Sequence, residues 1–195
     1  MSSEYYEKHG RKFAEATVNL PVDSLYQPFL KYVPKAGHIL DAGCGSGRDI
    51  KAFRHRGFLI TAIDESPDMV TLASEFSGQE VLQMSFQELE FHDSFDGIWA
   101  CASLLHVPET QMDDVLVRLS NALKNQGVLY ASFKHGTSET IRNGRFFNDY
   151  SAEKLTARLS QHPLLHLLDS WLSSDVRPER ADESWLNALI RKSSD

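Results

Sequence analysis

Residues 37–53 read GHILDAGCGSGRDIKAF and hold the most informative local pattern of the chain. The apolar run over 38–43 predicts a short buried strand, and the segment 46–57 predicts a helix. Three alternate glycines lie where the strand meets the helix. Glycine loses more backbone freedom on folding than any other residue, so this concentration indicates a turn with a specific conformational or ligand-binding task.

Composition and charge narrow the class of protein. The chain has 195 residues, 42% of them apolar and 24% charged, with a net charge of -7 and no basic stripe. These values suit one globular domain and argue against nucleic-acid binding. The charged N-terminus has no apolar signal segment, and no run approaches the ~18 apolar residues of a membrane span. Two cysteines, Cys44 and Cys101, fit a reducing compartment. We therefore expect a cytoplasmic protein without nucleic-acid or membrane partners; its oligomeric state stays open.

Strand and helix patterns alternate along the first two thirds of the chain. Ser66 is expected to cap one helix, with Pro67 at its first position. Such alternation predicts parallel βαβ units in a doubly wound α/β sheet. After residue 134 we expect a loop over 135–150, a helix over 151–161 and two further strands over 165–174 and 184–192. The first five strands are expected over 38–43, 58–64, 80–84, 95–103 and 127–134, and the helices among them over 46–57, 66–78 and 108–127.

The glycine spacing distinguishes between nucleotide-like ligands. The order is G-x-G-x-G, with Arg48 where the third glycine of a dinucleotide fingerprint belongs, and no P-loop lysine follows. The second expected strand ends in Asp64, about 20 residues after Asp41, where an acid can accept hydrogen bonds from ribose hydroxyls. The pattern favours a nucleoside-containing ligand and disfavours a nicotinamide-dependent oxidoreductase, which remains an alternative.

Four segments together resemble a known family. The segments ILDAGCGSGRD, TAIDESPDMV, FDGIWACASLLHVP and ALKNQGVLYASF are similar, in order, to the motifs of class I S-adenosylmethionine-dependent methyltransferases. The segments SFKHGTSETIRNGRFFNDYS and RADESWLNALIRK further resemble small bacterial methyltransferases near the tellurite-resistance methyltransferases. The resemblance implies a Rossmann-like three-layer sandwich whose seven-stranded, mostly parallel sheet has an antiparallel last strand. It also implies S-adenosylmethionine as cofactor.

The resemblance divides a single domain, residues 1–195, into three parts. Residues 1–20 would form a lid or cap, 36–134 the cofactor-binding core, and 135–195 the acceptor-side loop and C-terminal strands. Asp64 would bind the ribose, and Ser85 takes a place where the family often has an adenine-binding acid. The full expected cofactor set is Asp41, Gly43, Cys44, Gly45, Arg48, Asp64, Glu65, Met69, Ser85, Phe86, Ala100 and Cys101.

Other residues are candidates for the acceptor side and for catalysis. His106 is the best-placed titratable group for a general base; alternatively it satisfies the start of the next helix. His162 and His166 have the spacing of metal ligands, but Pro163 lies between them and no partner carboxylate is evident, so no metal site is expected. The acceptor candidates are Tyr6, Phe13, Lys134, Arg145, Phe147 and Tyr150, whose cations could pair with an anionic acceptor.

The expected function is direct methyl transfer to a small-molecule acceptor, with an oxyanion such as tellurite among the candidates, giving S-adenosylhomocysteine. The limited length beyond the cofactor fold favours a small acceptor over a macromolecule. Two alternatives remain: a noncatalytic module that only binds S-adenosylmethionine, and a methyltransferase acting on protein or RNA.

Overall fold

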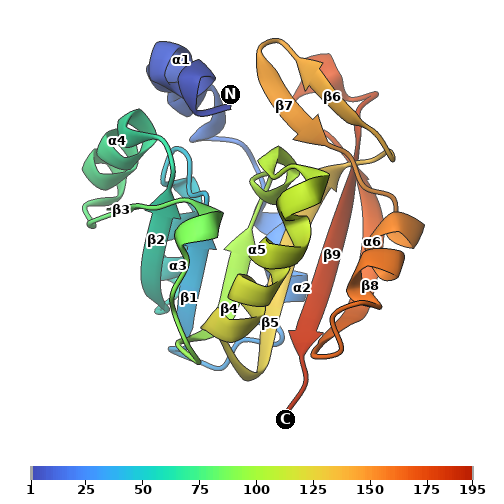
Figure 1. Cartoon of the computed structure of the whole chain (residues 1–195). Coiled ribbons are helices and arrows are strands. Elements are labelled where there is room, and N and C mark those ends of the chain that lie inside the picture. Colours follow the sequence, from blue (N-terminus) through green and yellow to red (C-terminus); the bar gives the residue numbers. More distant parts are fainter. Residues whose placement is uncertain (1, 195) are drawn as a thin grey trace.

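Seven strands form one sheet in the order β3-β2-β1-β4-β5-β9-β8 (Figure 1). The computed structural model describes residues 2–194. The first five strands are parallel, and β9 runs antiparallel to both β5 and β8. The expected doubly wound sheet with an antiparallel last strand is therefore confirmed. Its strands are β1 (His38–Ala42), β2 (Leu59–Asp64), β3 (Leu82–Gln83), β4 (Phe95–Ala100), β5 (Leu123–Lys134), β8 (Leu165–Ser174) and β9 (Ser184–Lys192).

Helices cover both faces of the sheet because successive residues of a strand point to opposite faces. Leu40 of β1 joins the core beneath α5 and α6, whereas its neighbour Ile39 joins the core beneath α2 and α3. Both residues are fully buried, as expected for a parallel strand between two helical layers. The helices are α1 (Ser2–Thr17), α2 (Asp23–Leu30), α3 (Arg48–His55), α4 (Pro67–Ser77), α5 (Glu109–Ala122) and α6 (Ala152–Leu159).

The helix α4 begins and ends at the expected residues. The Ser66 hydroxyl accepts a hydrogen bond from the Met69 backbone N–H, and Pro67 occupies the first turn. Gly78 ends the helix in the left-handed conformation, with φ 66°. These local signals need no tertiary contact, which is why the sequence predicts them well.

The segment 135–150 differs from the expected loop. It contains a two-stranded hairpin, β6 (Glu139–Arg142) and β7 (Arg145–Asn148), joined by Asn143 and Gly144. Both turn residues have positive φ, 52° and 78°, so the Asn-Gly pair makes the tight turn that suits the twist of paired strands. The loop prediction was wrong because the Asn-Gly turn pairs the segments on either side of it as two strands.

The N-terminal helix α1 lies above the carboxyl ends of the parallel strands, next to α4 and the hairpin (Figure 1). A Cβ at Gly10 would lie 2.8 Å from Cε of Met69, so the small glycine permits close approach to α4. The helix therefore closes the edge of the sheet at which α/β proteins bind ligands. Among the described residues, no helix is long and apolar enough to cross a membrane.

Candidate active site

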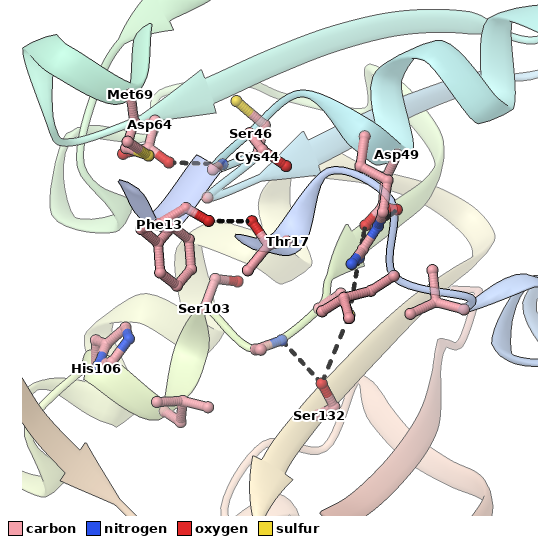
Figure 2. A pocket seen from close by; sticks show the side chains of 18 of the residues that line it. Phe13, Thr17, Cys44, Ser46, Asp49, Asp64, Met69, Ser103, His106 and Ser132 are labelled. Carbon is pink, nitrogen blue, oxygen red and sulfur yellow. Dashed lines mark hydrogen bonds and ion pairs between the residues drawn. The ribbon is translucent and has the colours of Figure 1, made fainter. Parts of the chain in front are cut away.

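A cavity of about 360 Å³ lies at the carboxyl edge of the sheet (Figure 2). Its wall comes from α1, the β1–α3 turn, the ends of β2, β4 and β5, the hairpin, and the connection between β8 and β9. The volume falls within the range of small-molecule sites. In Figure 2, Phe13 of α1 lies between Asp64 and His106, so the cavity has a β2 end and a hairpin end.

The β1–α3 turn forms the floor of the β2 end. The backbone N–H groups of Gly43 and Cys44 both donate to the Ile63 carbonyl at 2.9 Å, which fixes the turn to the end of β2. Gly43 has φ 78°, and a Cβ there would lie 2.5 Å from Cβ of Ser103. Only glycine accommodates both this conformation and this approach. The glycine therefore lets the turn lie against the segment after β4.

Asp64 ends β2 and faces the turn. One carboxylate oxygen accepts from the Gly45 N–H at 2.9 Å and the other from the Ser66 N–H at 3.0 Å. Burial raises the pKa of Asp64 to about 6, although these two hydrogen bonds act in the opposite direction. The carboxylate keeps lone pairs for further donors. Glu65 and Met69 line the cavity beside it.

A buried ion pair supports the other side of the turn. Asp49 accepts hydrogen bonds from Arg48 at 2.7 Å and 2.8 Å, from the Tyr26 hydroxyl at 2.6 Å and from Trp99 Nε1 at 2.8 Å. Burial alone would raise the pKa of Asp49, but the adjacent guanidinium and these hydrogen bonds outweigh it and lower the pKa. Arg48 lines the cavity, yet its charge is already paired.

His106 and Tyr6 meet at the hairpin end. His106 Nδ1 lies 2.6 Å from the Phe146 carbonyl oxygen and its Nε2 lies 3.1 Å from the Tyr6 hydroxyl. A carbonyl only accepts, so Nδ1 carries the hydrogen and Nε2 accepts from Tyr6. Burial lowers the pKa of His106 to about 4, with the nearby Arg145 charge acting in the same direction. The imidazole is therefore neutral near pH 7, with its Nε2 lone pair toward Tyr6.

Arg145 of β7 reaches the same end of the cavity. Its guanidinium carbon lies 5.0 Å from the Tyr5 ring centroid, 6.0 Å from that of Phe13 and 5.2 Å from that of Phe147. Lys134, at the end of β5, also lines the cavity, but its Nζ is bonded to Asp175 and Glu183. The two cations therefore differ: Lys134 has acidic partners and Arg145 is surrounded by aromatic rings.

Known proteins that resemble this chain are methyltransferases. A model described as a methyltransferase domain matches residues 39–127. The putative methyltransferase YqeM of Bacillus subtilis is 28% identical over 140 residues, which cover 66% of this chain and 57% of that protein. The putative methyltransferase GWCH70_2453 of Geobacillus is 33% identical over 115 residues, or 54% of this chain and 47% of that protein. The chain thus spans about half the length of these two relatives.

Solved structures agree on the fold. The 1,6-didemethyltoxoflavin-N1-methyltransferase of Burkholderia thailandensis, solved with 1,6-didemethyltoxoflavin and S-adenosylhomocysteine, superposes with a TM-score of 0.82 at 19% identity, covering 98% of this chain and 87% of that one. A TehB-like S-adenosylmethionine-dependent methyltransferase from Corynebacterium glutamicum gives 0.72 at 20% identity, covering 98% of each chain. Residues 39–127 thus match a methyltransferase domain, and the whole chain shares the fold of S-adenosylmethionine-dependent methyltransferases.

The β2 end of the cavity fits S-adenosylmethionine, the cofactor of the methyltransferases that the chain resembles. The turn brings the backbone of Gly43 and Gly45 to the cavity, and a Cβ at Gly45 would lie 3.8 Å from Phe13. Asp64 supplies a partly buried carboxylate beside that turn, where ribose hydroxyls could donate to it. Of the expected cofactor residues, the cavity wall contains Gly43, Cys44, Gly45, Arg48, Asp64, Glu65, Met69, Ser85, Phe86 and Cys101.

Ser85 begins a short 3₁₀ helix, Phe86–Glu88, at the edge of the same cavity. Its backbone N–H and its hydroxyl both donate to Glu88, at 2.8 Å and 2.7 Å. The Ser85 side chain is therefore engaged locally as a helix cap. Its hydroxyl oxygen keeps acceptor capacity toward a ligand.

Three expected site residues lie behind the cavity wall. Ala100 and Tyr150 are fully buried, and Asp41 is 2% exposed. The Tyr150 hydroxyl donates to Glu109 at 2.9 Å and its ring packs 4.6 Å from that of Phe133. Ala100 and Tyr150 therefore do not line the cavity, because their side chains pack into the interior.

Asp41 has an unusual environment next to the turn. Its Oδ2 is buried without a hydrogen-bond partner. Burial and the negative charge of Asp49 raise its pKa well above the usual range. Burial beside the negative charge of Asp49 thus favours the neutral form of Asp41, whereas the charge of Asp49 is compensated by Arg48.

Sequence reasoning missed Asp49 and Asp175. Asp175 accepts from Lys134 at 3.0 Å, from Arg177 at 2.6 Å and from Trp185 Nε1 at 3.0 Å. It thereby ties the β8–β9 connection to the end of β5. Each acid has one arginine partner close in the sequence, but the contacts that tie it into the fold, Trp99 for Asp49 and Lys134 for Asp175, are distant along the chain and leave no local signal. Within residues 2–194, no group of three or more potential ligands is placed to hold a metal ion.

Proposed function

We propose that this chain transfers the methyl group of S-adenosylmethionine to a small-molecule acceptor and releases S-adenosylhomocysteine. The observation that carries the proposal is the continuity of one cavity from Asp64 and the Gly-rich turn to Tyr6, His106 and Arg145. A ligand held at the first group would share its enclosure with a ligand at the second. Such an arrangement suits transfer between two bound molecules.

Such a reaction requires little chemistry from the protein's side chains. Bound S-adenosylmethionine supplies a methyl group already activated by its cationic sulfur. The protein contributes alignment of the acceptor and exclusion of water, for which α1 is placed over the sheet edge. Tyr6 and Phe13 of this helix line the cavity, so acceptor binding and cofactor enclosure would involve the same helix.

We further propose that His106 acts through the Tyr6 hydroxyl bonded to its Nε2: the hydroxyl orients the acceptor and, when the nucleophile arrives protonated, takes its proton as it passes its own to Nε2. The Phe146 carbonyl fixes the tautomer that leaves Nε2 unprotonated. The low pKa of about 4 keeps this nitrogen free of a proton at neutral pH. A base of such low pKa is weak, so we expect its main contribution to be orientation.

The acceptor class is proposed from the shape of the site. Helix α1 and the hairpin both border the cavity, which leaves room for a small acceptor and little for a folded macromolecule. Small-molecule acceptors include inorganic oxyanions such as tellurite. The likeness to a TehB-like structure concerns the fold alone.

A label-transfer assay tests this function and its alternatives. The protein is incubated with methyl-labelled S-adenosylmethionine and either the small-molecule or the macromolecular fraction of a bacterial extract, with tellurite in a separate arm. We expect Asp64-dependent label in small molecules. Asp64→Ala should abolish transfer, while Glu75→Ala, at an exposed α4 position, should not. Label in protein or RNA would favour a macromolecular acceptor, and binding without any transfer would favour a noncatalytic module.

A further inference from the structure

Among the side chains that the structure describes, Arg145 is a buried cation without an acidic partner. The residue is 9% exposed, and its Nε has no hydrogen-bond partner. No salt bridge joins it to any carboxylate among the described side chains. Its neighbours are the faces of Tyr5, Phe13 and Phe147, at 5.0 to 6.0 Å, and the neutral Tyr6 hydroxyl. Cation–π contacts compensate only part of the cost of burying a charge, so this guanidinium keeps capacity for an anion.

The other cations of the cavity wall differ in this respect. Arg48 is paired with Asp49, Arg177 with Asp175, and Arg180 lies 4.0 Å from Glu183. Lys134 contacts both Asp175 and Glu183. These cations have acidic partners within the protein, whereas Arg145 has none among the described side chains. An anionic ligand that enters the cavity would therefore gain the most favourable electrostatic interaction by binding to Arg145.

Arg145 lies at the hairpin end of the cavity, so an anion bound to its guanidinium would lie there too. The residue that follows it, Phe146, provides the carbonyl that fixes His106. Phe147 lies 5.2 Å, ring to ring, from His106, and Tyr6 joins His106 to the aromatic group through its contact with Phe13. The guanidinium, the imidazole and the aromatic rings thus form one group. Figure 2 shows His106 on the side of Phe13 away from Asp64.

We propose that Arg145 binds the anionic group of the methyl acceptor, and that the acceptor is a small organic carboxylate whose carbon framework packs on Tyr6, Phe13 and Phe147. The proposal rests on the proposed methyltransferase function. A guanidinium matches a carboxylate through two parallel hydrogen bonds. The aromatic rings favour a carbon framework, since a compact hydrated oxyanion gains nothing from apolar walls. Arg145 thereby selects the acceptor, and the Tyr6 hydroxyl bonded to His106 faces its nucleophile.

The test measures binding, so it does not require the true acceptor. Protein saturated with S-adenosylhomocysteine is titrated with benzoate, with benzamide as its uncharged counterpart, and with tellurite. We expect benzoate to bind about tenfold or more tighter than benzamide, the range of a charge-assisted hydrogen bond. Arg145→Gln should remove this preference, and Arg145→Lys should keep part of it. Arg142→Gln is the matched control, since Arg142 lies on the same hairpin and pairs with Asp149.

Each contrary outcome is distinct. Equal binding of benzoate and benzamide, or binding of neither, overturns the proposal, as does a preference that survives Arg145→Gln. Tighter Arg145-dependent binding of tellurite than of benzoate overturns the organic carboxylate. A large loss of S-adenosylhomocysteine affinity in Arg145→Gln would assign the guanidinium to the cofactor's own carboxylate. Failure of the wild-type protein to bind S-adenosylhomocysteine would instead contradict the proposed function itself.

Discussion

Replacing Asp64 by alanine should weaken S-adenosylmethionine binding by about 100-fold or more. Its two oxygens each accept one backbone N–H, at 2.9 Å from Gly45 and 3.0 Å from Ser66, and each keeps capacity for one ribose hydroxyl. Hydrogen bonds to a charged group contribute about 1.5–3 kcal/mol each. Losing two of them costs at least about 3 kcal/mol, and every 1.4 kcal/mol is a factor of about ten. Calorimetric titration measures the loss directly.

The same carboxylate predicts a pH dependence. Burial raises the pKa of Asp64 to about 6, so the ionised form that accepts from ribose predominates above that pH and is lost below it. Affinity should be constant above about pH 7 and fall about tenfold per unit below about pH 6. Asp64→Asn should bind weakly and without this pH dependence. Unchanged affinity in Asp64→Ala, with cooperative unfolding retained, would refute the ribose assignment.

Three further perturbations test other parts of the site. Asp49→Ala leaves a buried guanidinium unpaired, so chemical denaturation should show a loss of about 3–5 kcal/mol; a loss near zero would contradict the ion pair's structural role. Gly43→Ala should destabilise more than Gly57→Ala, because both glycines have positive φ but only Gly43 would clash, with Ser103 at 2.5 Å; equal thermal shifts would count against that close approach. His106→Ala should lower kcat at least about tenfold without changing S-adenosylhomocysteine affinity; an unchanged kcat would leave His106 a purely structural role.

The parts of the fold encoded in local sequence were predictable. The Gly-rich turn, the cap at Ser66 and the acid at the end of β2 each depend on neighbouring residues and formed as expected. The short α2 was not predicted, since it spans eight residues and contains Pro28. The hairpin was also missed, although its Asn-Gly turn is a local signal.

The parts of the site that depend on distant contacts were not predictable. Asp175 is 41 positions from Lys134, and nothing near either residue indicates their pairing. Tyr150 looked suitable for the acceptor side, but its hydroxyl turns to Glu109, 41 positions away. Ala100 lies on a strand, where successive side chains point to opposite faces of the sheet. An error of one position in the expected register therefore assigns a core residue to the cavity wall. Composition and residue spacing do not indicate in which direction these side chains point.

The central claim is that the cavity beside Asp64 binds S-adenosylmethionine. Calorimetric titration of the purified chain with S-adenosylmethionine, S-adenosylhomocysteine and NAD tests it most directly. We predict micromolar binding of the first two and none of NAD, as the G-x-G-x-G spacing indicates. Binding of neither sulfur compound, or binding of NAD alone, would contradict the account.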